Sequence, residues 1–282
     1  MTIQAWIDDT GLDGRSPEFL FSAVFATVED WASFSDRWKA VLDEPPAIPY
    51  FKMDDAVGFT HAFYGMSESK RNLKLMRLAS TFADHKHGFI ELALAADLNA
   101  IENELRPRAM KPANEAYFWP FQIVIQALCW ALLETSPDYD IPLEIYFDEN
   151  VVFGPRAKAW YPVIRAMAEP KVQQLMPVEP FFRDDRTTMP LQAADMTAWM
   201  RNADRKGANE FAWLKEHMVG LTWLRPIVRF GHEEIELLFQ KGPIPSDLQW
   251  KVVAAERAMV EQFIVRGARH YVPKSKKSKK KR

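Results

Sequence analysis

The strongest constraint on the fold is a pair of segments that alternate between two side-chain faces and then end in an acidic residue. Residues 3–8 read Ile-Gln-Ala-Trp-Ile-Asp, and residues 143–148 read Leu-Glu-Ile-Tyr-Phe-Asp. Such alternation is typical of β-strands, whose successive side chains point to opposite faces of a sheet. Each strand therefore carries its final aspartate, Asp8 or Asp148, on the face opposite to its aliphatic residues.

Strands and helices alternate along most of the chain. Residues 19–27 are apolar after the breakers Gly14 and Pro17, so they predict a hairpin with residues 3–8. This alternation predicts an α/β sheet opened by an antiparallel hairpin. Further strands are expected at 89–96, 178–182, 227–230 and 235–239, and helices at 67–83, 98–105, 115–134, 157–168, 191–202 and 246–265.

Composition places the chain among soluble globular proteins. It has 282 residues, of which 48% are hydrophobic and 26% charged, enough to bury a sizeable core. The longest apolar stretch is broken by Pro120 and Gln122, so no membrane span is expected. The chain shows no basic leader followed by an apolar stretch, and its single Cys129 cannot form an intramolecular disulfide. These features predict a cytoplasmic protein.

Positive charge is concentrated at the C-terminus. The last nine residues, 274–282, hold seven of the 36 basic side chains and no acid, which leaves 29 basic against 38 acidic residues in the rest of the chain. Such a block stays disordered and commonly grips phosphates, but it also serves simply as a solubilising tail. Lys276, Lys277, Lys279 and Lys280 are candidate nucleic-acid contacts in this block.

The two strand ends predict a paired carboxylate site. Ligands bind at the carboxyl edge of open α/β sheets, so Asp8 and Asp148 meet there if their strands are parallel neighbours. The alternative is that each aspartate is an ordinary turn residue, because aspartate is common after strands.

A third carboxylate favours the site over two separate turns. In the helix expected at 191–202, Asp195 lies within the apolar stripe, and Ala194 and Ala198 are small enough for the helix to approach a sheet closely. A buried carboxylate is costly unless it is paired or binds a metal. The other interpretation of Asp195 is therefore a structural ion pair with a lysine or arginine.

Three carboxylates without His or Cys suit Mg²⁺ or Mn²⁺ better than zinc. Such ions activate water and stabilise the leaving oxygen in phosphodiester cleavage. Asp8, Asp148 and Asp195 are thus the predicted metal ligands and catalytic residues, and Asp9 and Glu149 are predicted to assist them. The expected substrate is a nucleic acid, either DNA or RNA.

Four short motifs in this order also carry a family resemblance: 7–11 (Ile-Asp-Asp-Thr-Gly), 146–149 (Tyr-Phe-Asp-Glu), 181–185 (Phe-Phe-Arg-Asp-Asp) and 191–196 (Leu-Gln-Ala-Ala-Asp-Met). From about residue 3 to 203 the chain resembles the domain-of-unknown-function 3800 family of uncharacterised prokaryotic proteins. The resemblance implies a ribonuclease H-like mixed sheet flanked by helices, with acidic site residues at Asp8, Asp148 and Asp195. It departs from the family at Asp9-Thr10, where Glu-Ser is usual, and near residues 50–53, where the family often has Glu-x-His.

On this basis we expect a ribonuclease H-like domain at 1–203, a C-terminal α+β extension packed on it at 204–265, and a flexible basic tail at 266–282. Lys52 stands where the family often has an acid, so Asp54 or Asp97 is a candidate fourth ligand. The alternative function is a non-catalytic protein that uses this fold to bind nucleic acid or a protein partner, for example in defence against mobile elements.

Other catalytic signatures are missing from the sequence. It has no G-x-x-x-x-G-K-[ST], G-x-G-x-x-G or G-x-S-x-G motif, which excludes a P-loop ATPase and leaves dinucleotide-binding and serine hydrolase functions without support. Its six histidines show no zinc-ligand spacing. Lys52, Lys70 and Lys74 are candidates to line a phosphate groove, although a solvated helix face explains most of that cluster equally well.

Overall fold

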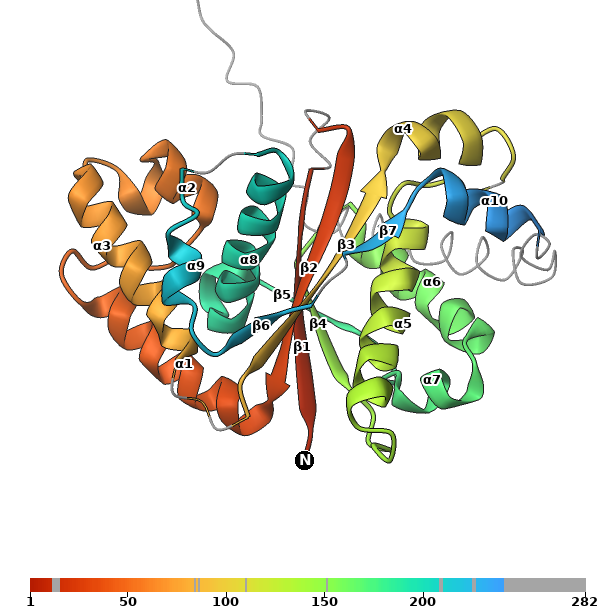
Figure 1. Ribbon diagram of the computed structural model, residues 1–282, viewed down its shortest axis with the longest axis horizontal. Helices are drawn as coiled ribbons and strands as arrows, with labels where there is room; N and C mark the ends of the chain where they lie inside the picture. The colour runs from red at the N-terminus through yellow and green to blue at the C-terminus, as the bar shows by residue number, and fades with distance from the viewer. Residues whose placement is uncertain are drawn as a thin grey trace, which may run out of the picture.

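A seven-stranded mixed sheet runs through the middle of the molecule, with helices on both faces (Figure 1). The computed structural model describes residues 1–11, 16–83, 85, 87–109, 111–150, 152–207, 210–224 and 227–240. The strands are β1 (Ile3–Thr10), β2 (Glu18–Thr27), β3 (Phe89–Asp97), β4 (Glu144–Asp148), β5 (Phe181–Arg183), β6 (Leu221–Trp223) and β7 (Val228–Phe230).

The strand directions follow the order of the sheet, β5-β4-β1-β2-β3-β6, with β7 also paired to β3. β2 is antiparallel to both β1 and β3, whereas β4 is parallel to β1 and to β5. The predicted hairpin and the mixed α/β class are confirmed, and the order and directions of β1 to β5 are those of a ribonuclease H-like sheet.

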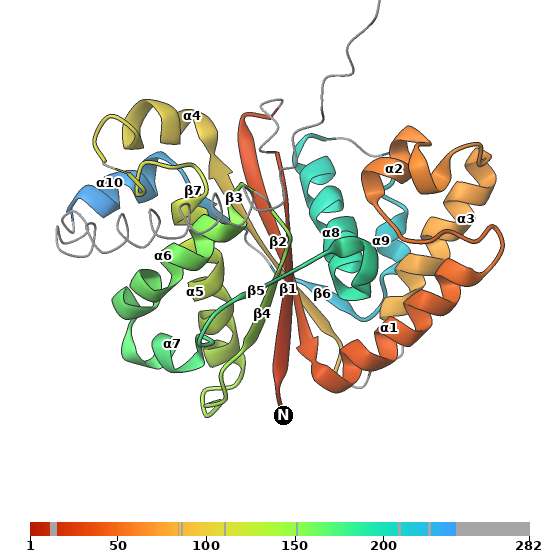
Figure 2. The same ribbon diagram turned by 180° about the vertical axis from the view of Figure 1, so that it is seen from behind.

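Helices form one layer on each face of the sheet, as the opposite view in Figure 2 also shows. The first layer contains α1 (Val28–Asp43), α2 (Met53–Gly58), α3 (Glu68–Ala79), α8 (Met189–Arg205) and α9 (Leu214–His217). The second contains α4 (Leu98–Ala100) with a π-helical turn at Ile101–Leu105, α5 (Phe118–Thr135), α6 (Gly154–Met167), α7 (Pro170–Leu175) and α10 (His232–Gln240). Short 3-10 turns lie at His61–Phe63, Ser80–Phe82 and Asp185–Thr187.

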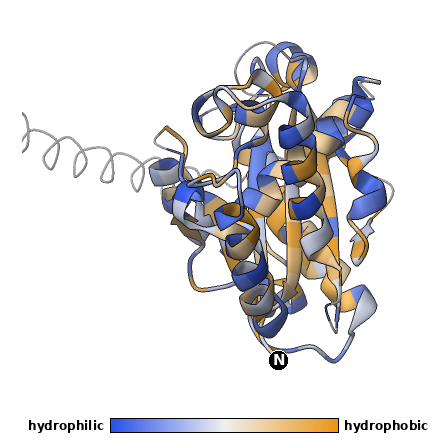
Figure 3. Ribbon diagram, turned by 90° about the vertical axis from the view of Figure 1, so that its left-hand side faces the viewer, coloured by the Kyte–Doolittle hydropathy of each residue, from blue (hydrophilic) through white to orange (hydrophobic). Residues whose placement is uncertain are grey.

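The alternation in β1 and β4 separates two apolar cores. Ala5 and Ile7 lie in the core under α5 and α6, together with Phe147, while Trp6 lies in the core under α1 and α8. Figure 3 shows apolar residues running along the central strands, with hydrophilic residues on the outer helices. The side-chain faces predicted for both strands are therefore confirmed.

Several elements differ from the expectations, among them the short α2, α7, α9 and β6, which no expected range covers. Residues 235–239, expected as a strand, belong to helix α10, because Glu233 and Glu234 form an acidic first turn and Ile235, Leu238 and Phe239 share one helical face. Helix α1 was not predicted, although Trp31, Phe34, Trp38 and Leu42 repeat at helical spacing and are all buried.

The C-terminal part adds strands to the same sheet. β6 pairs with Phe89–Glu91 of β3, and β7 pairs with Leu94–Ala96 of the same strand. The domain boundaries expected at residues 203 and 265 stay predictions. The helix expected at 246–265 and the basic tail at 266–282 lie outside the described residues.

Helix α5 is the one helix of the described ranges that is long and apolar enough to cross a membrane. More than half of its residues are buried inside the protein, which is typical of a core helix.

Candidate active site

Asp8 and Asp148 lie side by side at the carboxyl edge of the sheet. The parallel register pairs Trp6 with Tyr146 and Ile7 with Phe147, so the next residues along the two strands are Asp8 and Asp148. The Trp6 and Tyr146 rings stack with centroids 3.9 Å apart, which fixes the two strands on the face that carries both aspartates. Both carboxylates are partly buried and keep some contact with solvent.

Helix α8 brings Asp195 to the same place. It packs against β1 and β2 through its small residues, of which Ala194 and Ala198 are almost completely buried. One turn further along α8, the buried Arg201 donates from Nε to Oε2 of Glu91 in β3 at 2.8 Å, which ties the helix to the sheet. Asp195 itself is partly buried, as its position in the apolar stripe predicts.

These carboxylates are close enough to shift one another's pKa values. Burial raises the pKa of Asp8 well above its usual value, and the charges of Asp195, Asp9 and Asp148 raise it further. Burial followed by the charges of Asp54 and Asp185 raises the pKa of Asp195 to about 7, against the opposing effects of Lys52 and of a backbone hydrogen bond. Like charges resist joint ionisation in this way only when they are close together.

Asp9 belongs to the same cluster from the other side of β1. Burial and the charge of Asp148 raise the pKa of Asp9 to about 7, while Lys52 opposes the shift. Tyr117, the residue directly before α5, also lies near the cluster, because burial and then the charges of Asp9, Asp8 and Asp148 raise its pKa well above its usual value. Negative charge thus collects at both faces of the strand ends.

Asp148 and Glu149 have different roles. Burial and the charge of Asp185 raise the pKa of Asp148 to about 6, although the backbone amides of Glu149 and Asp185 donate to its carboxylate. The Glu149 amide lies 2.8 Å from Oδ1 of Asp148 and also donates to the carbonyl of Arg183 at 2.9 Å. Glu149 itself is exposed, so its backbone positions Asp148, and an assisting role for its carboxylate stays a prediction.

Two residues of α8 hold the segment before α2 against the site. Oε1 of Gln192 accepts from the Phe51 amide at 3.2 Å, and one turn later Oδ2 of Asp195 accepts from the Met53 amide at 2.6 Å. Lys52 lies between these two anchored amides. The backbone on both sides of Lys52 is therefore fixed, and this determines the direction in which the Lys52 side chain points.

Lys52 pairs with a carboxylate that the sequence interpretation did not select. Its Nζ lies 2.8 Å from Oδ2 of Asp185, which is buried in the turn after β5. Burial acts to lower the pKa of Lys52, but the hydrogen bond and charge of Asp185, followed by Asp195 and Asp148, raise it above its usual value. The ion pair considered for Asp195 is thus formed by Asp185 instead.

The other lysines that were candidates for phosphate contacts lie in less suitable positions. Lys74 is buried, and its ammonium donates to the carbonyl groups of Val41, in the last turn of α1, and of Glu44, directly after it, so it presents no charge to a phosphate. This corrects its expected position in a phosphate groove. Lys70 is exposed on α3, and Lys276, Lys277, Lys279 and Lys280 lie outside the described residues.

The two candidates for a fourth metal ligand, Asp54 and Asp97, lie in different parts of the structure. Asp54 is exposed at the start of α2, close enough to raise the pKa of Asp195. Asp97 instead caps α4, where Oδ1 accepts from the amides of Asn99 and Ala100. Asp185 also lies near the cluster, because its charge raises the pKa of both Asp148 and Asp195.

The side chains of the acidic cluster offer only carboxylate oxygens to a metal ion. Carboxylate oxygens are the ligands that Mg²⁺ and Mn²⁺ prefer, and mutual repulsion within the cluster favours a cation. Within the described ranges, no three His, Cys, Asp or Glu side chains stand as a ready group for one ion. The chemistry of the cluster fits such an ion, whereas binding it requires side-chain adjustment.

Comparisons with known proteins add little. No protein-family model matches the chain, and no curated protein matches it in sequence. Among solved structures, ribonuclease H2 from Pyrococcus horikoshii OT3 is similar with a TM-score of 0.37 and 15% identity, over 93% of this chain and 99% of that chain. A likeness of this size carries no argument about the site, so the fold assignment depends on strand order and direction.

Proposed function

We propose that this protein is a divalent-metal-dependent nuclease or a related phosphodiester-transfer enzyme that acts on nucleic acid. The observation that supports this proposal is that Asp8 of β1 lies close enough to Asp148 of β4 and Asp195 of α8 for their charges to raise its pKa. Each has a pKa raised by burial and by neighbouring carboxylates. Membership of the domain-of-unknown-function 3800 family is part of the same proposal.

The three aspartates would hold Mg²⁺ or Mn²⁺ through their carboxylate oxygens. Such an ion supplies Lewis-acid stabilisation of the charge that develops on a phosphodiester. The chain supplies the positions: the Met53 amide orients Asp195, and the Glu149 amide orients Asp148. Asp9, with a pKa near 7, is suited to exchange a proton with water at neutral pH.

A cleavage assay with matched variants tests the proposal. The purified protein is incubated with labelled single-stranded and double-stranded DNA, RNA and hybrids in Mn²⁺, Mg²⁺ or chelator. Asp8→Asn should reduce metal-dependent cleavage by orders of magnitude, whereas Asp138→Asn, in the exposed loop at the opposite edge of the sheet, should cleave like the parent. Cleavage that persists in chelator, or in Asp8→Asn, would contradict the proposed site.

Lys52 is the specific observation that favours a second candidate function. A resident cation next to Asp185, Asp195 and Asp148 offsets part of the charge that a metal ion would otherwise balance. In that case the protein binds nucleic acid or a protein partner without cleaving it. Mn²⁺ separates the two functions, because a metal site in the folded state should raise the melting temperature, and Asp8→Asn should remove that increase.

A further inference from the structure

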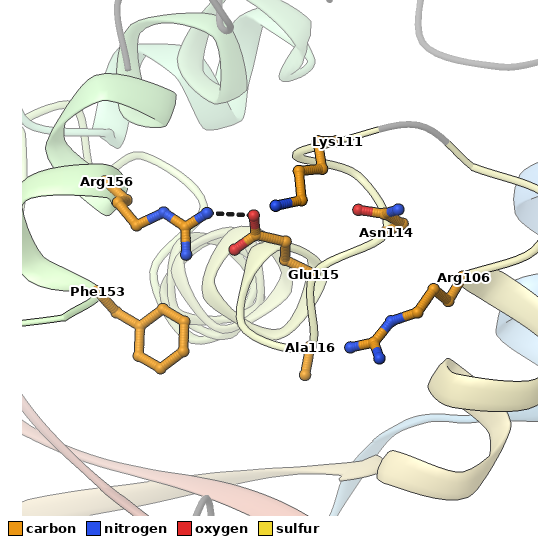
Figure 4. A pocket seen from close by; sticks show the side chains of 7 residues that line it. All are labelled: Arg106, Lys111, Asn114, Glu115, Ala116, Phe153 and Arg156. Atoms are coloured by element: carbon orange, nitrogen blue, oxygen red, sulfur yellow. Dashed lines mark hydrogen bonds and ion pairs between the residues drawn. The ribbon is translucent and has the colours of Figure 1, made fainter. Parts of the chain in front are cut away.

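A second polar site lies on the other side of the sheet, in a cavity of about 480 Å³ (Figure 4). Its lining includes three basic side chains, Arg106, Lys111 and Arg156, with a single acid, Glu115. Phe153 forms an aromatic wall. A cavity of this size falls within the range of small-molecule binding sites.

The charges in this cavity are only partly balanced. Arg156 pairs with Glu115 across the cavity, as the dashed line in Figure 4 shows, and Arg106 pairs with Glu102 on the π-helical turn. Lys111 is exposed at the rim. The lining as a whole therefore carries an excess of positive charge in a protein whose body, without residues 274–282, is acidic.

The surrounding backbone increases this preference for an anion. Helix α5 begins directly after Ala116 and Tyr117, and helix α6 begins directly after Phe153. Neither first turn has a side-chain cap, and the amino end of a helix carries partial positive charge. In Figure 4 α5 is seen nearly end-on behind Glu115.

One aromatic pair separates the cavity from the acidic cluster. The Tyr117 ring stacks on Phe153 with centroids 4.6 Å apart and planes 3° apart. The charges of Asp9, Asp8 and Asp148 also act on Tyr117, where they add to the effect of burial in raising its pKa. The loop that leads from Asp148 to α6 ends at Phe153, where the Phe153 amide donates to Oδ1 of Asn150 at 2.9 Å. The cavity and the cluster are thus neighbours at the same edge of the sheet.

We propose that this cavity binds a phosphate group of a single-stranded nucleic acid, on the same strand whose phosphodiester bond reaches the acidic cluster. The identity of the ligand as nucleic acid rests on the proposed function, whereas the cationic character of the cavity does not. A carboxylate cluster repels phosphates until a cation is bound, so a strand needs a cationic anchor beside it. Glu115 competes with that phosphate for Arg156.

Binding is measured with the full chain and 3′-labelled dT10 and rU10 in chelator, across a range of salt concentrations. Lys111→Gln should weaken binding about fivefold at 0.1 M salt and reduce the salt slope by about 0.7, the contribution of one phosphate contact on a single strand. Lys171→Gln, an exposed lysine on α7 at the opposite edge, should bind like the parent. Equal affinities and slopes for the two variants would overturn the proposal.

A charge change of the opposite sign gives a second test. Glu115→Gln should tighten binding, because it removes the negative charge that competes with the phosphate for Arg156, whereas Glu169→Gln, exposed just before α7, should change nothing. Failure of Glu115→Gln to tighten binding would count against the cavity even if that variant is less stable, provided that its melting temperature shows it folded.

The source of the phosphate is tested by competition. A strand should bind at least about tenfold tighter than adenosine monophosphate or inorganic phosphate, because it makes several phosphate contacts. Equal binding of the free nucleotide would overturn the strand as ligand. Loss of binding in Lys111→Gln without any cleavage by the parent would support the cavity and refute the nuclease, whereas cleavage by the parent with normal binding in Lys111→Gln would refute the cavity alone.

Discussion

Two aspartates on either side of Lys52 have opposite electrostatic roles. Asp185 forms the ion pair with Lys52 at 2.8 Å, so its charge is compensated. Asp195 accepts from the Met53 amide, and burial followed by the charges of Asp54 and Asp185 raises its pKa to about 7, although Lys52 opposes this shift. Removing one negative charge should therefore harm the fold at residue 185 and relieve it at residue 195.

The paired variants Asp185→Asn and Asp195→Asn test this contrast in metal-free buffer at pH 7.5. Asp185→Asn should lower the free energy of unfolding by about 1 kcal/mol, a small value because Lys52 is partly exposed. Asp195→Asn keeps an oxygen for the Met53 amide, so its stability should equal or exceed that of the parent. Chemical denaturation measures both, and a large loss in Asp195→Asn would contradict the proposed repulsion.

The same repulsion predicts how stability depends on pH. Asp9 and Asp195 have pKa values raised to about 7, and Asp148 to about 6, from about 3.9 in an unfolded chain. Between pH 4 and 7 the folded state thus holds protons that the unfolded state has released, so stability falls as pH rises through this range. The metal-free parent should lose several kcal/mol from this cluster between pH 5 and 7.5.

Melting temperatures at several pH values measure this loss, with the Asp9→Asn/Asp195→Asn double variant, which removes the two groups with pKa values of about 7, as the reference for the other titrating groups. The parent should lose more stability with rising pH than the double variant. Mn²⁺ should reduce the difference at pH 7.5, because a cation favours the ionised carboxylates. Identical pH profiles for parent and double variant would refute the raised pKa values.

Among the secondary-structure elements, helix α8 makes the hydrogen bonds that hold the segments of the site together. Gln192 is completely buried and joins three segments: it accepts from Nε1 of Trp38 at 2.9 Å and from the Phe51 amide, and it donates to the Asp185 carbonyl at 2.9 Å. The segments before α2 and after β5 are thereby fixed on one helix. Lys52 and Asp185 are held opposite one another by the same side chain.

Gln192→Leu should lower the free energy of unfolding by about 2–4 kcal/mol, because it keeps the volume but leaves buried polar groups without partners. The natural control is Gln122→Leu in α5, where the buried Oε1 has no partner among the described residues, so that substitution should be neutral or stabilising. Urea unfolding compares the two. Similar losses for both variants would show that Gln192 contributes volume rather than hydrogen bonds.

Local sequence patterns predict some of these elements better than others. Alternation is sufficient for β1 and β4, because one apolar core lies under each face of the sheet and burial decides the face of every side chain. The short segment at 235–239 fits both the helical and the strand period, and the acidic residues just before it, in the first turn of α10, indicate a helix. Helix α1 carries a clear helical period at Trp31, Phe34 and Trp38, so its sequence alone indicates a helix.

Residues whose role depends on partners far along the chain were harder to predict. Asp185 follows a strand of three residues, too short to show alternation, although its place after Phe181-Phe182 was a usable signal. Lys74 has the spacing of a solvated helix face, but its ammonium is buried because it donates to carbonyl groups at the C-terminal end of α1. Asp8, Asp148 and Asp195 can be selected from the sequence because each ends or interrupts an apolar pattern, and their role as metal ligands stays a prediction.

For the whole molecule, charge distribution decides how an anionic strand could approach. Without residues 274–282 the chain carries 29 basic and 38 acidic side chains, and part of that negative charge lies in the site itself. An acidic body repels nucleic acid over roughly a Debye length, about 10 Å at 0.1 M salt. Binding then depends on local cations, which are the seven basic residues of the tail and the cavity around Lys111.

Deletion of residues 274–282 should weaken binding to every sequence alike and flatten its salt dependence, because fewer counterions are released from the strand. Cleavage of a short substrate at saturating concentration should survive, since Asp8, Asp148 and Asp195 are untouched. The deletion and Lys111→Gln should reduce the salt slope additively if tail and cavity contact different phosphates. Anisotropy titrations at several salt concentrations measure all three proteins, and an unchanged slope after the deletion would assign the tail to solubility alone.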